Sequence, residues 1–370
     1  MSSSIQVLEQ GLLYENPIPH LRSRNGYFPG VVRLPSRDLL ALFVVAEAFE
    51  AANATICASR SRDDGRTWHF EGPIYRKPDS PLTSDSVKPL VLPGGNLLGL
   101  GYRFHRPGSD EDLANPDTNG LRDGDNVVTH SSDEGHTWTA PQVIPTQRPE
   151  TIEVSGPAIQ LSSAEILAVG SLFPLWDGTR PSGNVGVLLR SADQGQTWDD
   201  STLFFETGSN IAPSEPRICE MQSGRVVALV WACDEDLGKS LTNHVTVSHN
   251  GGRTWSSPMD TGIPAQASNL MYLGQDLLLT VHCHREFGEV GVFVRLVDFQ
   301  KDRWKVLAEK NVWSETARHP IRGYADMGTG LKFGQAALLP MGEDQFRVTH
   351  WAIGRDGQGR ILTHRIQLHR

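Results

Sequence analysis

One glutamate in this chain is fixed by its neighbours in a way that suits chemistry. Glu215 lies in the segment Pro213-Ser-Glu-Pro-Arg217, between two prolines and close to an arginine. Proline restricts the backbone around it, so the carboxylate is held in place before any ligand arrives, as a catalytic or binding group must be. The segment could instead be a loop in which Glu215 pairs with Arg217 for structural reasons. We favour the functional interpretation.

Two histidines have a spacing that could bind a metal ion. His282 and His284 lie two residues apart, so on a strand both side chains point to the same face. Histidines satisfied by hydrogen bonds within a strand are the more ordinary interpretation. The chain has no phosphate-binding loop, dinucleotide fingerprint or dense cluster of metal ligands. We therefore expect neither a metal nor an organic cofactor.

Four near-copies of one eight-residue motif recur along the chain. Each reads S-x-D-x-G-x-T-W, with Asn for Asp in the last copy, and their starts lie 70, 60 and 57 residues apart. The Asx side chain caps backbone amides, the glycine accepts a positive φ, and the tryptophan anchors the resulting turn by burial. A fixed motif at this period indicates a repeat architecture. The copies are Ser61–Trp68, Ser131–Trp138, Ser191–Trp198 and Ser248–Trp255.

The motif resembles the Asp-box of the sialidase-like β-propellers, a superfamily recognised by its fold rather than by one activity. Six units of apolar run, turn and apolar run accompany the boxes, which is an all-β signal. These units are residues 28–43, 88–100, 156–169, 216–230, 268–281 and 333–350. We therefore expect an all-β, six-bladed β-propeller with four-stranded antiparallel blades as one domain over residues 1–370. A strand at about residues 5–13 should close the last blade.

The composition limits the partners and the location of the protein. A net charge of −9 argues against nucleic acid and anionic membranes as partners. No stretch approaches the roughly 18 apolar residues of a membrane span, and the N-terminus lacks the regions of a signal peptide. The four scattered cysteines favour buried free thiols over disulfides. We expect a cytoplasmic protein, whose oligomeric state stays open.

A propeller brings residues from distant parts of the chain to one central channel. Residues just before the innermost strands converge there, and the ends of the second strands add to them. The set is polar where the flanking sequence is apolar. As residues that bind a small carbohydrate or glycoside substrate we select Arg24, Tyr27, Glu47, Asp85, Lys88, Arg103, His105, Arg217, Trp231, His282, His284 and Gln335.

The resemblance to sialidases breaks at the residues that would bind sialic acid. Sialidases use three arginines to hold the substrate carboxylate, because a guanidinium matches it bidentately. Here Tyr27 stands where the first is expected, Asn243 and His244 at the second, and residues 282–286 at the third. The superfamily's glutamate before the fourth inner strand matches Glu215, and its tyrosine nucleophile corresponds to Tyr324. The resemblance therefore does not imply sialic acid as the substrate.

The superfamily is also similar to propeller exo-arabinanases, which use two glutamates. In that light Glu153 and Glu215, on adjacent blades, form a candidate pair of catalytic carboxylates, with Tyr324 as a third catalytic candidate. One carboxyl needs a raised pKa to act as an acid, and the other must stay ionised. Arg217 is expected to keep the Glu215 carboxylate charged. The leading hypothesis is an exo-acting glycoside hydrolase, which would be retaining if the carboxyls lie about 5 Å apart and inverting if the gap is wider.

Two other classes of function stay open. A polysaccharide or oligosaccharide lyase would use a neutral His or Tyr as base and a cation such as Arg103 or Lys88 for a uronate carboxylate. The base would be one of His105, His282, His284 and Tyr102. Alternatively, the chain is a propeller that binds carbohydrate without catalysis, since Asp-boxes persist in such proteins.

Overall fold

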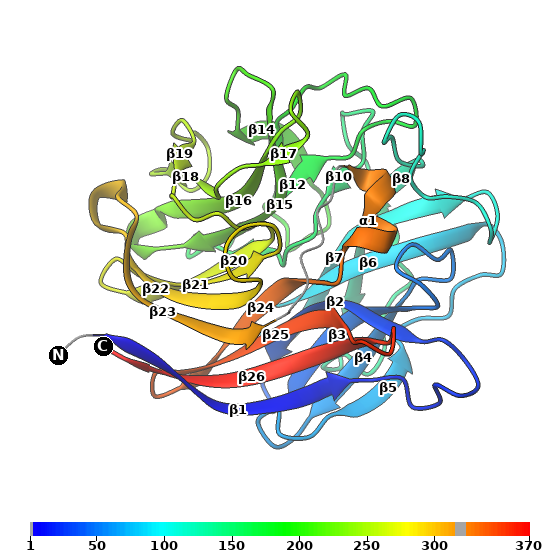
Figure 1. Ribbon diagram of the computed structural model, residues 1–370, viewed down its shortest axis with the longest axis horizontal. Coiled ribbons are helices and arrows are strands. Elements are labelled where there is room, and N and C mark those ends of the chain that lie inside the picture. Colours follow the sequence, from blue (N-terminus) through cyan, green and yellow to red (C-terminus); the bar gives the residue numbers. More distant parts are fainter. Residues whose placement is uncertain (1–2, 315–322) are drawn as a thin grey trace.

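Six antiparallel sheets arranged in a ring form the computed structural model of this chain, which describes residues 3–314 and 323–370 (Figure 1). Blade 1 consists of β2 (Asn25–Arg33), β3 (Leu39–Ala46), β4 (Thr55–Ser61) and β5 (His69–Pro73). Blade 2 consists of β6 (Leu82–Val91), β7 (Leu97–Arg106), β8 (Gly124–Ser131) and β9 (Gln142–Ile144). Blade 3 consists of β10 (Ile152–Glu153) with β11 (Ile159–Gln160), β12 (Ile166–Leu172), β13 (Gly186–Ser191) and β14 (Asp199–Phe205).

Blades 4 to 6 follow the same plan. Blade 4 consists of β15 (Ile211–Glu220), β16 (Val226–Asp234) with β17 (Lys239–Ser240), β18 (His244–Ser248) and β19 (Met259–Asp260). Blade 5 consists of β20 (Ser268–Gly274), β21 (Leu277–His284), β22 (Gly291–Asp298) and β23 (Lys305–Ser314). Blade 6 consists of β24 (Phe333–Gly342), β25 (Gln345–Ile353), β26 (Gly359–His369) and β1 (Ser4–Tyr14). The helices are η1 (Gln222–Gly224), η2 (Gln300–Asp302) and α1 (Tyr324–Gly330). The expected six-bladed all-β propeller is confirmed.

The two ends of the chain meet in blade 6. Strand β1 pairs antiparallel with β26, from Ser4 opposite His369 to Tyr14 opposite Ile361, as Figure 1 shows along the lower edge. The sixth sheet is therefore built from both ends of the sequence, and β1 contains the segment expected to close the ring.

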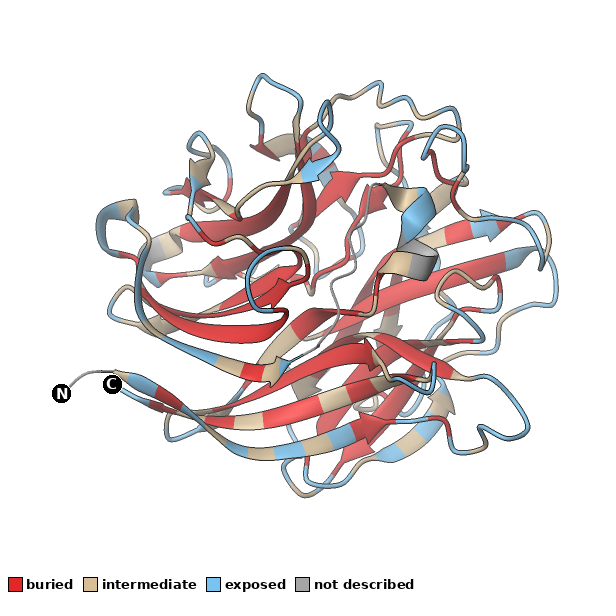
Figure 2. Cartoon of the chain, viewed as in Figure 1, coloured by how far each residue is buried: buried red, intermediate tan, exposed pale blue. Residues whose placement is uncertain are grey.

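The apolar core lies between neighbouring sheets. One cluster joins Leu279 and Val294 of blade 5 to Phe333 and Val348 of blade 6, all essentially inaccessible to solvent. Burial of one such side chain contributes about 1.5–3 kcal/mol. Figure 2 shows the inner and middle strands largely buried and the connecting loops exposed, so the sheets are packed through their faces and the loops are free to carry function.

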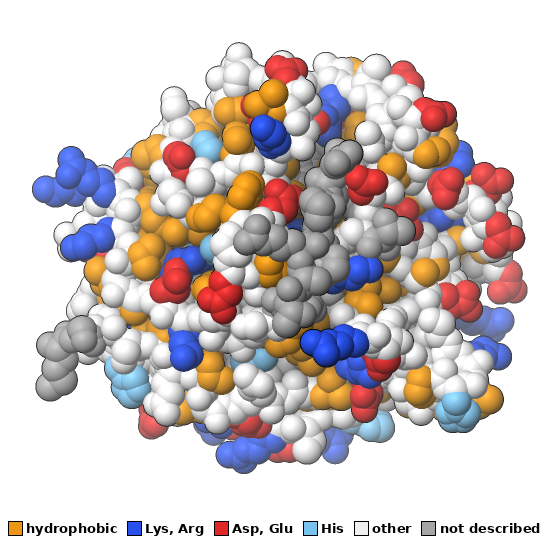
Figure 3. Space-filling model, in the orientation of Figure 1, with side chains coloured by type: hydrophobic (Ala, Val, Ile, Leu, Met, Phe, Trp, Pro, Cys, Tyr) orange, Lys and Arg blue, Asp and Glu red, His pale blue; other side chains and the backbone are white. Residues whose placement is uncertain are grey.

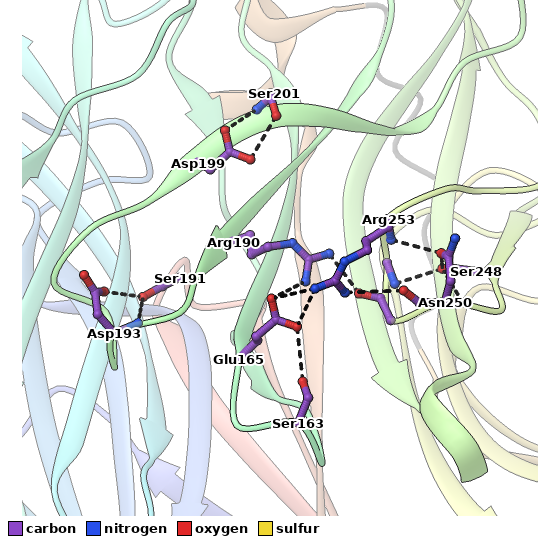
Figure 4. Close-up of polar contacts among 12 residues, drawn as sticks. Ser163, Glu165, Arg190, Ser191, Asp193, Asp199, Ser201, Ser248, Asn250 and Arg253 are labelled. Atoms are coloured by element: carbon purple, nitrogen blue, oxygen red, sulfur yellow. Dashed lines mark hydrogen bonds and ion pairs between the residues drawn. The ribbon is translucent and has the colours of Figure 1, made fainter.

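The four Asp-boxes share one network of hydrogen bonds. In the third, the Asp193 carboxylate accepts bonds from Ser191 Oγ at 2.8 Å and from Thr197 N at 2.9 Å. Ser191 Oγ also accepts the Gly195 amide at 2.8 Å, and Trp198 Nε1 donates to the Gly195 carbonyl at 3.0 Å. The Thr197 bonds lower the pKa of Asp193 to about 2. Figure 4 shows the third and fourth boxes, the latter with Asn250 in the aspartate position.

An arginine from the preceding blade holds three of the four box turns. The Nη2 atoms of Arg60, Arg190 and Arg347 donate to main-chain oxygens of the next blade's box, at 3.0, 2.8 and 2.8 Å. Figure 4 shows Arg190 also against Glu165, which is 3.1 Å away and bonds Arg253 of the fourth box as well. We call Arg60, Arg190 and Arg347 the inter-blade arginines; they connect consecutive sheets at the outer edge of the ring.

Replacing Arg347 with methionine should destabilise the ring where blade 6 meets blade 1. The side chain is buried, and its loss removes the donor to the Asp64 carbonyl and to Thr363 Oγ1. We expect the free energy of unfolding, measured by urea denaturation, to fall by about 1.5–3 kcal/mol. The control Arg66→Met changes an exposed arginine of the first box and should stay within about 0.5 kcal/mol of wild type. A similarly small change for Arg347→Met would contradict the role given to it.

Candidate functional site

Three of the six inner strands carry the same irregularity. Phe28 in β2, Glu215 in β15 and Gln335 in β24 have positive φ angles of 55°, 43° and 42°, and the strand register shifts at each. A left-handed conformation costs such residues roughly 1–3 kcal/mol, and a bulge redirects a side chain. All three side chains line one cavity at the centre of the ring. The strained backbone thus serves to point them there.

The central hollow, called the inner cavity below, has a volume of about 100 Å³. Its wall combines carboxylates with aromatic rings and contains no lysine, arginine or histidine from the described part of the chain. The carboxylates are Glu50, Asp85, Glu153 and Glu215, and the aromatic residues are Phe28, Phe49, Tyr102, Phe104, Phe173, Trp231 and Tyr324. Acidic side chains also gather along the right-hand edge of the face in Figure 3. The wall is negatively charged and disfavours an anionic ligand.

Glu153 and Glu215 lie side by side in this cavity, although 62 residues separate them in the chain. The Glu215 amide donates to Glu153 Oε2 at 3.5 Å, and Ser171 Oγ donates to the same oxygen. Both glutamates are buried. Burial first, and the Glu215 charge second, raise the pKa of Glu153 to about 7. Glu153 therefore exchanges its proton near neutral pH, as a general acid and base does.

Glu215 has a donor on one carboxylate oxygen only. Gln335 Nε2 donates to Glu215 Oε1 at 2.6 Å, whereas the buried Oε2 atom has no hydrogen-bond partner among the described residues. Arg217 does not bond this carboxylate, contrary to expectation. Its Nη1 atom donates instead to Ser155 Oγ at 3.1 Å and to the carbonyls of Glu215 and Pro216 at 3.0 and 2.8 Å. Arg217 therefore fixes the backbone of the bulge.

Asp85 is the third carboxylate of the cavity with a fixed position. Its oxygens accept bonds from Arg103 Nε at 3.0 Å and from the Tyr75 hydroxyl, and Lys77 Nζ lies 3.9 Å away. Burial raises the pKa of Asp85, and Arg103 opposes that shift. Arg103 thus lies behind Asp85 as its counter-ion and is not itself part of the cavity wall.

Tyr324 and Trp231 form one side of the cavity. The Tyr324 ring meets Phe173 edge-on at 5.9 Å, and Trp231 Nε1 donates to Ser240 Oγ at 3.2 Å. Burial first and the nearby Glu153 charge raise the pKa of Tyr324, so its hydroxyl stays protonated. Such a phenol can donate a hydrogen bond to a ligand, but it is a poor nucleophile.

Three residues selected from blades 1 and 2 lie outside the inner cavity. Tyr27 is buried in the apolar core against Phe49 and Trp351, each at 5.4 Å between ring centroids. Lys88 is buried beneath the cavity and donates to the Phe28 carbonyl at 2.7 Å; burial and Arg217 lower its pKa to about 7. Arg24 is half-buried and does not line the cavity. The bulge presents Phe28 to the cavity in place of Tyr27.

The selected histidines and Glu47 are also placed elsewhere. His282 is buried within blade 5, with ring nitrogens 2.8 Å from Asn243 Oδ1 and from Thr280 Oγ1. The His284 ring packs against Phe293 at a tilt, with 4.5 Å between ring centroids, and burial, with Arg295, lowers its pKa to about 3. His105 pairs with Asp125 on the surface at 2.9 Å. Glu47 is an exposed loop residue. These positions correct the expectation that all four would face the substrate.

Sequence reasoning selected Trp231 and Tyr324 from the aromatic wall, but not its phenylalanines or Glu50. The candidates were polar residues at strand ends, and aromatic residues in strands are usually core. A signal for Phe28 exists in retrospect, because the Phe-Pro step resembles the Glu-Pro step at residues 215–216, and both steps are at bulges. No local pattern distinguishes Phe49 or Phe173 from a core phenylalanine.

Neither a cluster of metal ligands nor a membrane-spanning helix occurs among the described residues. Within residues 3–314 and 323–370, no group of three or more His, Cys, Asp or Glu side chains could hold a metal ion. In the same ranges, no helix is long and apolar enough to cross a membrane.

Comparisons with known proteins identify the family of the chain and its fold. Residues 113–315 match the family described as BNR repeat-like domain, and no protein of curated function matches. Among solved structures, a protein of unknown function from Dyadobacter fermentans DSM 18053 is 19% identical, with a TM-score of 0.76 and 99% of each chain covered. At such an identity the likeness shows the fold alone.

Two further similar structures have names that state an activity. A Hadza microbial sialidase, Hz136, is 16% identical at a TM-score of 0.64, and 94% of this chain covers 66% of that one. An α-L-arabinanase from Penicillium chrysogenum, complexed with arabinobiose, is 15% identical at a TM-score of 0.64, with 97% and 98% covered. The second matches this chain over almost its whole length.

Proposed function

Since the chain belongs to the BNR repeat-like family of sialidase-like propellers, we propose that it is an exo-acting glycoside hydrolase whose catalytic pair is Glu153 and Glu215. The observation that carries this proposal is that both carboxylates line the inner cavity, where the Glu215 main-chain amide contacts the Glu153 carboxylate and the surroundings of the two side chains differ. Pairs of titratable groups whose surroundings push their pKa values apart divide the roles of acid and base or nucleophile.

We give each glutamate one role on the basis of its surroundings. Glu153, protonated near neutral pH, donates its proton to the oxygen of the leaving group. Glu215 Oε2, which has no donor among the described residues, attacks the anomeric carbon while Gln335 holds Oε1. Glu153 then takes a proton from the water that hydrolyses the glycosyl-enzyme bond. A double displacement of this kind retains the configuration of the sugar, and it requires carboxyl groups about 5 Å apart.

The charge of the inner cavity supports a neutral sugar as the substrate. A sialic acid carboxylate would meet four acidic side chains and, among the described residues of the wall, no cation. Aromatic rings beside carboxylates suit a sugar ring, which has apolar faces and hydroxyl edges. Tyr324 would donate a hydrogen bond to the bound sugar. A lyase with a histidine base loses support because His105, His282, His284 and Lys88 all lie outside the cavity, whereas Tyr102, the other base of that alternative, lines it.

A panel of glycosyl fluorides and aryl glycosides tests the proposal. We expect turnover of at least one neutral sugar, an α-L-arabinofuranoside or another pentoside or hexoside, with retained configuration seen by ¹H NMR of the first product. The matched comparison is the aryl sialoside, which the enzyme should hydrolyse at least about 100-fold more slowly, because its carboxylate lacks a counter-ion. Faster turnover of the sialoside would contradict the substrate class. Binding without any turnover would favour the non-catalytic alternative.

A further inference from the structure

A second cavity of about 230 Å³ adjoins the inner cavity, and the two share Ser214, Trp231 and Tyr324. We call it the outer chamber; its other lining residues come mainly from residues 118–119, 172–185 and 233–240. We propose that the outer chamber binds the neutral sugar that leaves during hydrolysis, so that the natural substrate is a disaccharide or longer. This inference rests on the proposed function and adds a binding site to it.

Loops of blades 2 and 3 are joined where they border the outer chamber. Asn115 Nδ2 and Thr118 Oγ1 donate to the Trp176 carbonyl at 3.0 and 2.7 Å. The guanidinium of Arg122 lies 3.7 Å above the centre of the Trp176 ring, which adds a cation–π contact. These contacts hold the two loops as one wall.

Two more contacts complete the border. Arg180 Nη1 donates to Glu235 Oε2 at 3.0 Å and so connects the loop of blade 3 to that of blade 4. The Ala325 amide at the start of α1 donates to Asn119 Oδ1 at 3.2 Å. The chamber is therefore enclosed by segments of three blades and one helix that are bonded to one another. A site with walls fixed in advance loses little entropy when a ligand binds.

The side chains of the outer chamber suit hydroxyl groups. Two cations, Arg180 and Lys239, are balanced by two carboxylates, Glu235 and Asp234, the second of which lies opposite Lys239 in the β16–β17 pairing. Their charges cancel, whereas the inner cavity is acidic throughout. Asn184, which also lines the chamber, can donate and accept hydrogen bonds. A neutral, polyhydroxylated ligand fits this environment better than an ionic one.

The position of the outer chamber relative to the catalytic pair gives it its role. Ser214 lies in both walls and directly precedes Glu215. A sugar in the inner cavity would thus present its scissile bond at the Ser214, Trp231 and Tyr324 border, with the remainder of the substrate in the outer chamber. The larger volume there can hold one whole sugar unit.

Filling the outer chamber tests the inference. Asn184→Trp places an indole in it, and Asn96→Trp, in an exposed turn between β6 and β7, is the matched control. Binding is measured by calorimetry for arabinobiose with arabinose, and for other neutral disaccharides with their non-reducing sugars. For wild type and Asn96→Trp we expect at least one disaccharide to bind at least about tenfold more tightly than its single sugar. Asn184→Trp should reduce that advantage to below about threefold and leave the single sugar unaffected.

A persisting advantage in Asn184→Trp would overturn the inference, as would equal affinities of wild type for every pair. If Asn184→Trp fails to fold, the double variant Asn184→Ala with Lys239→Ala replaces it, with the same expectations. Turnover separates this inference from the proposed function. A glycosyl fluoride, with a one-atom leaving group, needs only the inner cavity, so Asn184→Trp should change its kcat/KM by less than about twofold. If wild type hydrolyses nothing, the proposed hydrolase is wrong, and the binding data still decide the outer chamber.

Discussion

Glu215→Gln should lower kcat/KM for a glycosyl fluoride by at least about 10³-fold, because the amide cannot form the covalent glycosyl intermediate. The substitution preserves the size of the side chain and removes its charge beside Gln335 and Glu153. We therefore expect the Tm to be equal to or above that of wild type, since a buried negative charge is lost. The measurement is steady-state hydrolysis of the substrate that the panel identifies.

Glu220→Gln is the matched control for this variant. Glu220 lies on the same strand, β15, but accepts hydrogen bonds from Ser162 at the outside of the blade. Its activity should stay within about twofold of wild type. A further variant, Glu215→Ala with added azide, should release a glycosyl azide of inverted configuration. Equal turnover by wild type and Glu215→Gln would remove Glu215 from the mechanism.

The activity of the wild-type enzyme should fall as pH rises through about 7, the pKa of Glu153. The protonated form is the acid catalyst, and it is lost above that pH. In Glu153→Gln this alkaline limb should disappear, and kcat/KM for a disaccharide should drop by about 10²–10⁴-fold. Hydrolysis of a glycosyl fluoride should suffer less, because fluoride leaves with little help from an acid.

The stability of the fold should change with pH in the same window. The pKa of Glu153 is raised by folding, so its contribution to stability is complete below about 4.5 and is lost as pH rises through about 7. Glu153→Gln removes that loss. In urea denaturation the variant should therefore gain on wild type between pH 4 and pH 8. For activity, an alkaline limb of kcat/KM that stays unchanged in Glu153→Gln would mean that another group is the acid.

The sequence was informative where structure is local or follows the repeat. The Asp-boxes are single turns whose side chains bond their own backbone, so each motif carries its structure with it. Glu153 and Glu215 lie close together because both come just before or within an inner strand of adjacent blades, a position that the repeat defines. The same reasoning failed for His282 and His284, because spacing indicates that two side chains share a face but not which face meets the cavity.

Other parts of the site depend on contacts that do not recur from blade to blade. The bulges that turn Phe28 and Gln335 inward interrupt the regular alternation of strand faces, so a register count assigns Tyr27 to the cavity instead. The walls of the outer chamber come from loops of different length, joined by contacts such as that between Arg180 and Glu235. Only three-dimensional packing brings such residues together.

Because β1 pairs with β26, the chain could begin at a different blade and still form the same ring. Because the first and last strands run side by side, a short peptide could join β1 to β26, and new ends could be made in a turn such as Pro93–Gly94, where both residues are exposed. Such a circular permutant would keep every sheet and the inner cavity. New ends could also be placed at each junction between blades in turn, and the stability of these permutants would show which junction contributes most to the fold.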